Sequence, residues 1–180
     1  YTGLINHDRV SIATFNDVLV SEIPARSGRN QIWRVLGILN DANPKGETNL
    51  EESIKSFFAR KRARGLVFVL SDFLDLRGVE SSVKLISKHG HEICAIHIVS
   101  PDELDPGRLE DVVLVDSENG DSAELISNIQ ILDEYKGKFL EYCKGVENIC
   151  LSNGSGYVLA NTEQSLERLM FLAMRSKGIV

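Results

Sequence analysis

The sequence predicts an α/β fold whose sheet is mostly parallel, with antiparallel hairpins at its edge. Two apolar runs, Leu66–Leu70 and Ile93–Val99, are rich in β-branched residues, which is typical of strands buried on both faces. Segments with the apolar spacing of helices separate these runs from each other and from the rest of the chain. Because strands alternate with helices, we expect crossover connections and hence parallel pairing.

The first third of the chain predicts two strands followed by two helices. These elements are expected at Val10–Phe15, Val18–Ile23, Gln31–Leu39 and Leu50–Arg62. The short turn Asn16-Asp17 predicts that the two strands form a hairpin, and Pro24–Gly28 is expected to be a loop. Thr48 begins a T-x-x-E capping box, so we expect it to be the N-cap of the second helix.

The rest of the chain predicts three further helices and a second hairpin. The helices are expected at Val79–Lys88, Ile131–Lys144 and Glu163–Ser176, and the further strands at Val112–Val115, Ala123–Ile126 and Tyr157–Leu159. The Asn119-Gly120 pair lies between the two strands of the hairpin and is the strongest short-range hairpin signal. Thr162 is the expected cap of the last helix. The length of 180 residues, without an internal repeat, predicts a single domain over residues 1–180.

Length and charge exclude some classes of protein. The 180 residues carry a net charge of −6, which disfavours binding to the phosphate backbone of nucleic acids. No apolar run is long enough to cross a bilayer, so we expect no membrane segment. The three cysteines are an odd number and widely separated, which fits a reducing compartment such as the cytoplasm better than a disulfide framework.

Polar residues follow the first apolar run directly. Ser71 and Asp72 come at its end, with Asp75 close behind, and Thr48 lies in the loop before the second helix. In open α/β sheets, ligands bind beyond the carboxyl ends of the strands. Hydroxyl and carboxylate oxygens from different loops are suited to a hard cation such as Mg²⁺. A structural interpretation stays open: Thr48 caps its own helix, and Asp72 or Asp75 caps the helix at Val79.

Other motifs predict no chemistry. His89-Gly90-His91 lies at a helix end without accompanying zinc ligands, and His97 is expected to be a hydrogen-bonded core residue. The glycine-rich stretch 153–156 lacks both nucleotide-binding patterns, and there is no G-x-S-x-G elbow.

The order of several short segments resembles one family. HDRVSIATFND, GETNL, LSDF, GHEICAIHI, PDELD and VDSENGD occur in this order over nearly the whole chain. Together they resemble the bacterial and archaeal family of unknown function with a von Willebrand factor A-like domain, which is often encoded beside MoxR-type AAA+ ATPases.

This resemblance implies a doubly wound, Rossmann-like sheet with helices on both faces and a metal-ion-dependent adhesion site at its carboxyl edge. Three loops form such a site. Thr48 in GETNL matches the threonine of the second loop, and Asp72 in LSDF matches the aspartate of the third. Ser71 and Asp75 are candidate neighbours. The D-x-S-x-S motif of the first loop does not occur here.

The resemblance also implies that the chain is truncated at its N-terminus. The motif-bearing first strand would lie between the strands at Val10 and Leu66, so we expect these two to lack a neighbour along one side. The site should then be incomplete, and this chain by itself should bind Mg²⁺ weakly or not at all. The chain could compensate by rearranging its sheet or by pairing with a second copy.

These expectations favour a non-enzymatic protein-interaction module. The resemblance implies a MoxR-type ATPase, or a client that it remodels, as the partner, and a homo-oligomer is a further expectation. One alternative is a metal-assisted phosphohydrolase that uses Asp72 at the same sheet edge. Another is a scaffold domain whose metal site is vestigial.

Overall fold

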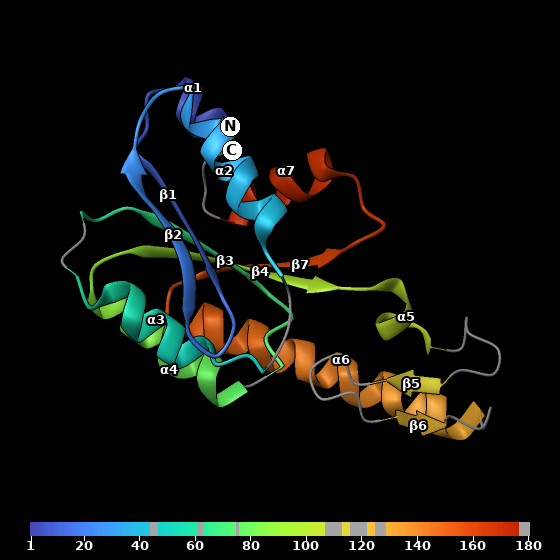
Figure 1. The fold of residues 1–180 in the computed structure, drawn as a ribbon. Helices are drawn as coiled ribbons and strands as arrows, with labels where there is room; N and C mark the ends of the chain where they lie inside the picture. The colour runs from blue at the N-terminus through green and yellow to red at the C-terminus, as the bar shows by residue number, and fades with distance from the viewer. Residues whose placement is uncertain are drawn as a thin grey trace. The chain divides into compact units, whose positions relative to one another are not determined.

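The computed structural model describes residues 1–43, 47–60, 63–74, 76–106, 113–115, 122–124 and 129–176. The chain divides into two compact units, the first built mainly from Tyr1–Lys61 and the second from nearly all of the rest (Figure 1). The first unit contains α1 (Thr2–Ile5), β1 (Val10–Phe15), β2 (Leu19–Arg26), α2 (Gln31–Asp41) and α3 (Leu50–Phe58). The second contains β3 (Leu66–Ser71), α4 (Leu76–Lys88), β4 (Glu92–Val99), α5 (Pro101–Leu104), β5 (Val113–Val115), β6 (Ser122–Glu124), α6 (Ile129–Ser152), β7 (Gly156–Asn161) and α7 (Leu166–Ser176).

In the first unit, β1 and β2 form the predicted antiparallel hairpin. Its turn is closed by the side chain of Asn16, whose Oδ1 accepts the N–H of Val18 at 3.2 Å. The prediction of a loop from Pro24 was wrong, because β2 continues to Arg26. The register shifts between Val10 and Ile12, opposite Pro24. Such an irregularity accommodates a residue that cannot donate a ladder hydrogen bond.

The N-terminus of α3 is capped by Asn49 rather than Thr48, which corrects the prediction. Asn49 Oδ1 accepts the N–H of Glu52 at 3.0 Å, so the capping motif starts one residue later than the T-x-x-E pattern indicates. The backbone N–H of Asn49 and the hydroxyl of buried Ser53 both donate to the Asn16 carbonyl. These hydrogen bonds fasten α3 to the hairpin turn.

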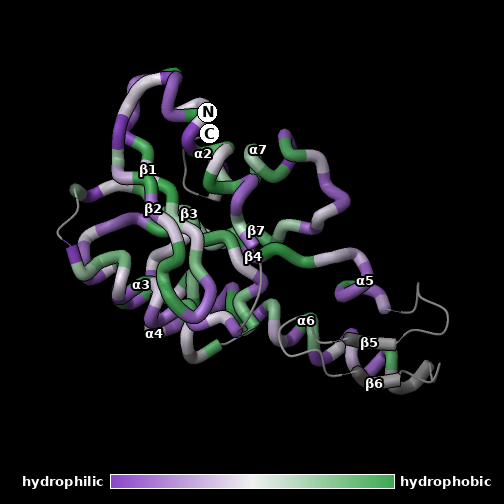
Figure 2. Tube along the Cα trace, viewed as in Figure 1, coloured by the Kyte–Doolittle hydropathy of each residue, from purple (hydrophilic) through white to green (hydrophobic). Residues whose placement is uncertain are grey.

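The second unit is built on a parallel three-stranded sheet in the order β3-β4-β7. The register runs without a shift, Leu66 opposite Glu92 and Cys94 opposite Gly156. Apolar residues follow one another along β3 and β4 (Figure 2). A mixed α/β architecture with parallel strands is therefore confirmed.

Helices lie on both faces of this sheet (Figure 1). On one face α4 and α6 cover His97 and its neighbours, with Val79, Val83 and Ile86 of α4 buried. On the other face α7 packs against β4 and β7, where Cys94, Val158 and Ala173 form a buried cluster. The core of the unit is therefore divided by the sheet into two layers.

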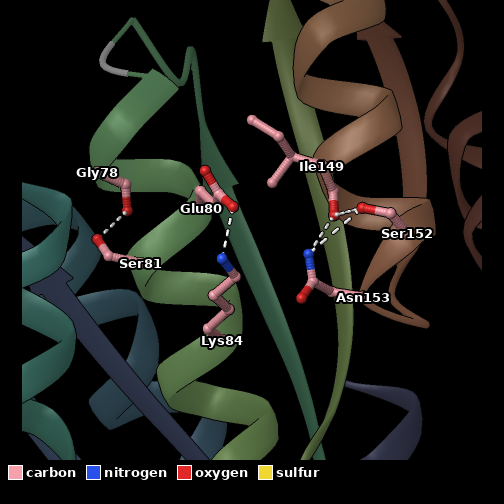
Figure 3. A network of polar contacts seen from close by, with 7 residues as sticks. All are labelled: Gly78, Glu80, Ser81, Lys84, Ile149, Ser152 and Asn153. Atoms are coloured by element: carbon pink, nitrogen blue, oxygen red, sulfur yellow. Dashed lines mark hydrogen bonds and ion pairs between the residues drawn. The ribbon is translucent and has the colours of Figure 1, made fainter.

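Several helices differ in length from the prediction. α4 begins at Leu76, three residues before the predicted start, and α6 extends to Ser152 instead of Lys144. Figure 3 shows polar contacts on both helices, including the pairing of Lys84 with Glu80 on α4 and the hydrogen bond that the Asn153 amide donates to the Ile149 carbonyl after the end of α6. α7 begins at Leu166, so the cap predicted at Thr162 was wrong; the Ser165 hydroxyl accepts the Arg168 N–H instead.

The predicted second hairpin is confirmed. β5 and β6 pair antiparallel, with Val113 opposite Glu124, although the turn between them lies outside the described residues. Within the described parts of the chain, every helix is too short or too polar to cross a bilayer.

Candidate functional site

The carboxyl end of β3 leads into a short loop that exposes Asp72. Ser71 is the last residue of the strand, and its hydroxyl accepts the Phe73 N–H at 3.1 Å and contacts Asp72 Oδ1 at 3.3 Å. Phe73 has a φ of 52°, a left-handed conformation that costs a residue other than glycine about 1–2 kcal/mol. Its side chain is buried, so packing of the ring offsets this strain.

Buried aromatic residues hold the backbone of this loop. The Tyr142 hydroxyl, on α6, donates to the Phe73 carbonyl. The ring of His97, on β4, hydrogen-bonds the backbone of Asp72 and packs edge-on against the Phe73 ring, with centroids 5.5 Å apart. Two successive residues of the loop are thus fixed by side chains from two other elements, while the Asp72 carboxylate remains exposed.

His97 is a hydrogen-bonded core residue, as predicted. Only 1% of its surface is exposed, and its Nδ1 lies 2.9 Å from the Tyr157 hydroxyl. Burial lowers the pKa of the imidazole, and the nearby Asp72 backbone and carboxylate only partly oppose this. A neutral ring between two hydrogen-bond partners positions the Asp72 loop and carries no charge of its own.

The predicted site residues have different outcomes. Ser71 and Asp72 lie together in the loop just described, in the second unit. Thr48 belongs to the first unit, where its exposed position precedes the Asn49 cap. Asp75 lies outside the described residues.

Ser100, at the end of β4, is already engaged. Its hydroxyl accepts the Glu103 N–H at 3.1 Å, and the Glu103 carboxylate accepts the Ser100 N–H at 2.6 Å. This capping box starts α5, a helix of a single turn.

Ser71 and Asp72 have suitable chemistry for Mg²⁺ but do not fit it by themselves. Mg²⁺ takes about six oxygen ligands in an octahedron, and these two residues offer oxygens from a single loop. No group of three or more His, Cys, Asp or Glu side chains that could hold a metal is found among the described residues. The site therefore needs oxygen ligands beyond this pair.

An apolar surface adjoins the Asp72 loop. Leu66, Phe68 and Leu70 alternate along β3 on one face of the sheet and are 39%, 48% and 54% exposed. The prediction that this strand is buried on both faces was wrong. Within the described residues β3 is an edge strand, and α7 covers this face of the sheet only over β4 and β7. We call these three residues the β3 apolar face. Nothing in the local sequence distinguishes it from a buried strand.

One protein family matches most of the chain. Residues 1–140 match the family described as "Protein of unknown function DUF58". The chain is 24% identical to Uncharacterized protein MAV169 of Mycobacterium avium over 164 residues, which cover 88% of this chain and 96% of that protein.

It is also 23% identical to Uncharacterized protein Mb1516 of Mycobacterium bovis and to Uncharacterized protein Rv1480 of Mycobacterium tuberculosis, over 95% of this chain. The chain spans 55% of the length of these two relatives. No solved structure matches. Since the family match extends over more than three quarters of its residues, the chain belongs to the DUF58 family.

Proposed function

We propose that this chain is a protein-interaction module that binds its partner at the carboxyl end of β3, with Asp72 as the central contact. The observation that carries the proposal is the way the Asp72 loop is held. Tyr142 and His97 fix its backbone, while the carboxylate is exposed. A charged group positioned before binding loses little conformational entropy when a partner docks, so its hydrogen bonds contribute more of their strength to affinity.

The surroundings of Asp72 support binding over catalysis. Among the described residues, the Ser71 hydroxyl is the one hydrogen-bond partner of the carboxylate. His97 contacts the backbone of Asp72 and is buried in the neutral form, so it is not arranged to exchange a proton with a substrate there. The β3 apolar face next to the loop adds the type of surface that protein partners cover.

The family resemblance supplies the finer parts of this proposal. It favours a single, doubly wound domain of the von Willebrand factor A type, with Mg²⁺ as the candidate cation and Asp72, Ser71 and Thr48 among its ligands. Because Ser71 and Asp72 do not suffice for Mg²⁺, the remaining oxygens must come from other residues or from the partner. The same resemblance favours a MoxR-type AAA+ ATPase as that partner.

A binding experiment tests the proposal. Calorimetry with a purified MoxR-type ATPase of the same organism should show binding that the Asp72→Asn variant weakens by about tenfold or more, since a hydrogen bond to a charged group contributes about 1.5–3 kcal/mol. Asp133→Asn, on the exposed surface of α6, is the matched control and should leave the affinity unchanged. Equal affinity of the two variants would contradict a role for Asp72.

Two further measurements separate the alternatives. Titration of the isolated chain with Mg²⁺ should show weak binding or none, and tight stoichiometric binding would show that the chain holds a complete site. Turnover of p-nitrophenyl phosphate in the presence of Mg²⁺, abolished by Asp72→Asn, would favour the phosphohydrolase and overturn the proposal of a binding module.

A further inference from the structure

We propose that β7, an edge strand of the sheet among the described residues, binds an extended, acidic peptide segment, which adds a fourth strand to the sheet. β7 and the Asp72 loop lie at opposite edges of the sheet, because β4 separates β7 from β3. The inference therefore concerns a second interaction surface and does not depend on the function proposed for Asp72.

The backbone of β7 offers unpaired hydrogen-bonding groups. In a parallel ladder, alternate residues direct their N–H and C=O to opposite sides of the strand. Thr162, just after β7, donates its N–H to the Val99 carbonyl at 3.0 Å. The backbone N–H and C=O groups of the even-numbered residues of β7 therefore point toward β4. Tyr157 and Leu159 consequently direct their backbone groups away from the sheet, where no described residue hydrogen-bonds them.

A groove runs along this edge. It has a volume of about 620 Å³ and is bordered by α6 on one side and α7 on the other. Tyr157 and Leu159 contribute to its lining, together with apolar residues such as Leu140 of α6 and Leu172 of α7. An extended chain placed here would meet strand hydrogen bonds at its backbone and apolar contacts at its side chains, the arrangement found where peptides bind by strand addition.

The charges at the groove indicate what the peptide carries. Lys144 on α6 and Arg175 on α7 line opposite walls, and neither forms an ion pair with another described residue. Among the described residues that line the groove, Glu147 is the one acidic side chain. Two cations against one anion favour an acidic partner locally, although the whole chain carries a net charge of −6.

A second copy of the chain is a poorer occupant of the groove. Pairing of β7 with β7 across a two-fold axis would bring the Lys144 and Arg175 pairs of both copies together, and like charges in one interface are unfavourable. An acidic segment of a different protein meets no such repulsion. We therefore assign the groove to a partner whose extended segment carries Asp or Glu.

A labelled peptide tests this inference on the intact chain. The probe is a peptide of about six residues, the length of β7. Valine and threonine alternate along it, except at two positions that carry glutamate. We expect fluorescence anisotropy to show binding that weakens about tenfold when both glutamates become glutamines, and that disappears when central amides are N-methylated so that strand pairing is blocked.

Variants of the protein complete the test. Lys144→Gln with Arg175→Gln should lower the affinity for the glutamate peptide to that for the glutamine peptide. Lys138→Gln, an exposed lysine of α6 that pairs with Glu134 outside the groove, is the matched control and should have no effect. Asp72→Asn should also leave peptide binding unchanged, so this inference and the proposed function can fail separately.

Three results would overturn the inference. The first is no binding of the glutamate peptide at about 1 mM. The second is equal binding of the N-methylated peptide, which would indicate attraction of an anionic molecule without strand addition. The third is concentration-dependent dimerisation of the chain that the double variant enhances and that blocks binding of the glutamate peptide, which would assign the groove to a second copy.

Discussion

The two edges of the β3-β4-β7 sheet differ in what covers them. Both β3 and β7 have one neighbour, β4, among the described residues. At β7, helices α6 and α7 cover the two faces, and two cations line the groove beside the strand. At β3, the apolar face is exposed, and the strand LVFVLS carries no charge. A strand added at β7 would therefore complete that edge, whereas only a binding partner that also covers a face of the sheet would bury β3.

The largest expected effect compares equivalent positions at the two edges. Val158 and Leu70 face the same side of the sheet, since both lie opposite Ile96, but Val158 is buried and Leu70 is exposed. We expect Val158→Asp to lower the free energy of unfolding by about 3 kcal/mol or more, because it buries an unpaired charge. Leu70→Asp should change it by about 0.5 kcal/mol or less.

Urea denaturation followed by circular dichroism measures both variants. If Leu70→Asp destabilises the protein as much as Val158→Asp, the β3 apolar face is covered in solution and the contrast between the two edges does not hold.

The second expected effect is a dependence of stability on pH, which reports how well the packing of α6 near β7 excludes water. Cys150 on α6 is fully buried, and burial, with smaller contributions from Cys94 and Glu147, raises its pKa from 9.0 to about 11. The unfolded thiol releases its proton first as pH rises, so the folded state loses stability between pH 9 and 11.

The expected loss from this thiol is about 1.4 kcal/mol for each pH unit in that window. Denaturation curves at pH 8, 9, 10 and 11 test it, with Cys150→Ala as the comparison. The variant should be less stable at pH 8 because of the cavity, yet show a shallower fall at alkaline pH. Parallel curves for the two proteins would mean that the thiol is accessible to water.

The smallest effect concerns the end of β3. Tyr142→Phe removes the hydroxyl that donates to the Phe73 carbonyl, and should lower the free energy of unfolding by about 1 kcal/mol. It should also raise the amide hydrogen-exchange rate of the Asp72 loop. Tyr135→Phe, at an exposed position of the same helix, is the control and should leave both quantities unchanged. An unchanged exchange rate in Tyr142→Phe would contradict the positioning role.

Much of the fold could be predicted because it depends on local pattern. The β1–β2 hairpin, the buried strand β4 and the adjacency of Ser71 and Asp72 at the end of β3 follow from periodicity and from strand termination. Capping was less predictable: two neighbouring residues, Thr48 and Asn49, were both chemically able to cap α3, and the backbone geometry selected Asn49.

The parts that depend on distant residues could not be predicted. Tyr142 is 69 residues from Phe73 in the sequence, and no local pattern indicates that its hydroxyl holds the Asp72 loop. The exposure of the β3 apolar face likewise depends on which strands and helices pack beside it. An apolar run predicts a strand that is stabilised by burial, and the tertiary arrangement determines whether its side chains are buried.

The β3 apolar face has a consequence for the abundance and half-life of the protein in a cell. An uncharged apolar edge strand without cover is a template for self-association, and it exposes the kind of surface that chaperones and proteases select. If the partner proposed above covers this face, we expect the amount of this protein to follow the amount of that partner, because copies made in excess would be removed. A twofold surplus of the chain should therefore be short-lived, while co-production with the partner should extend its half-life.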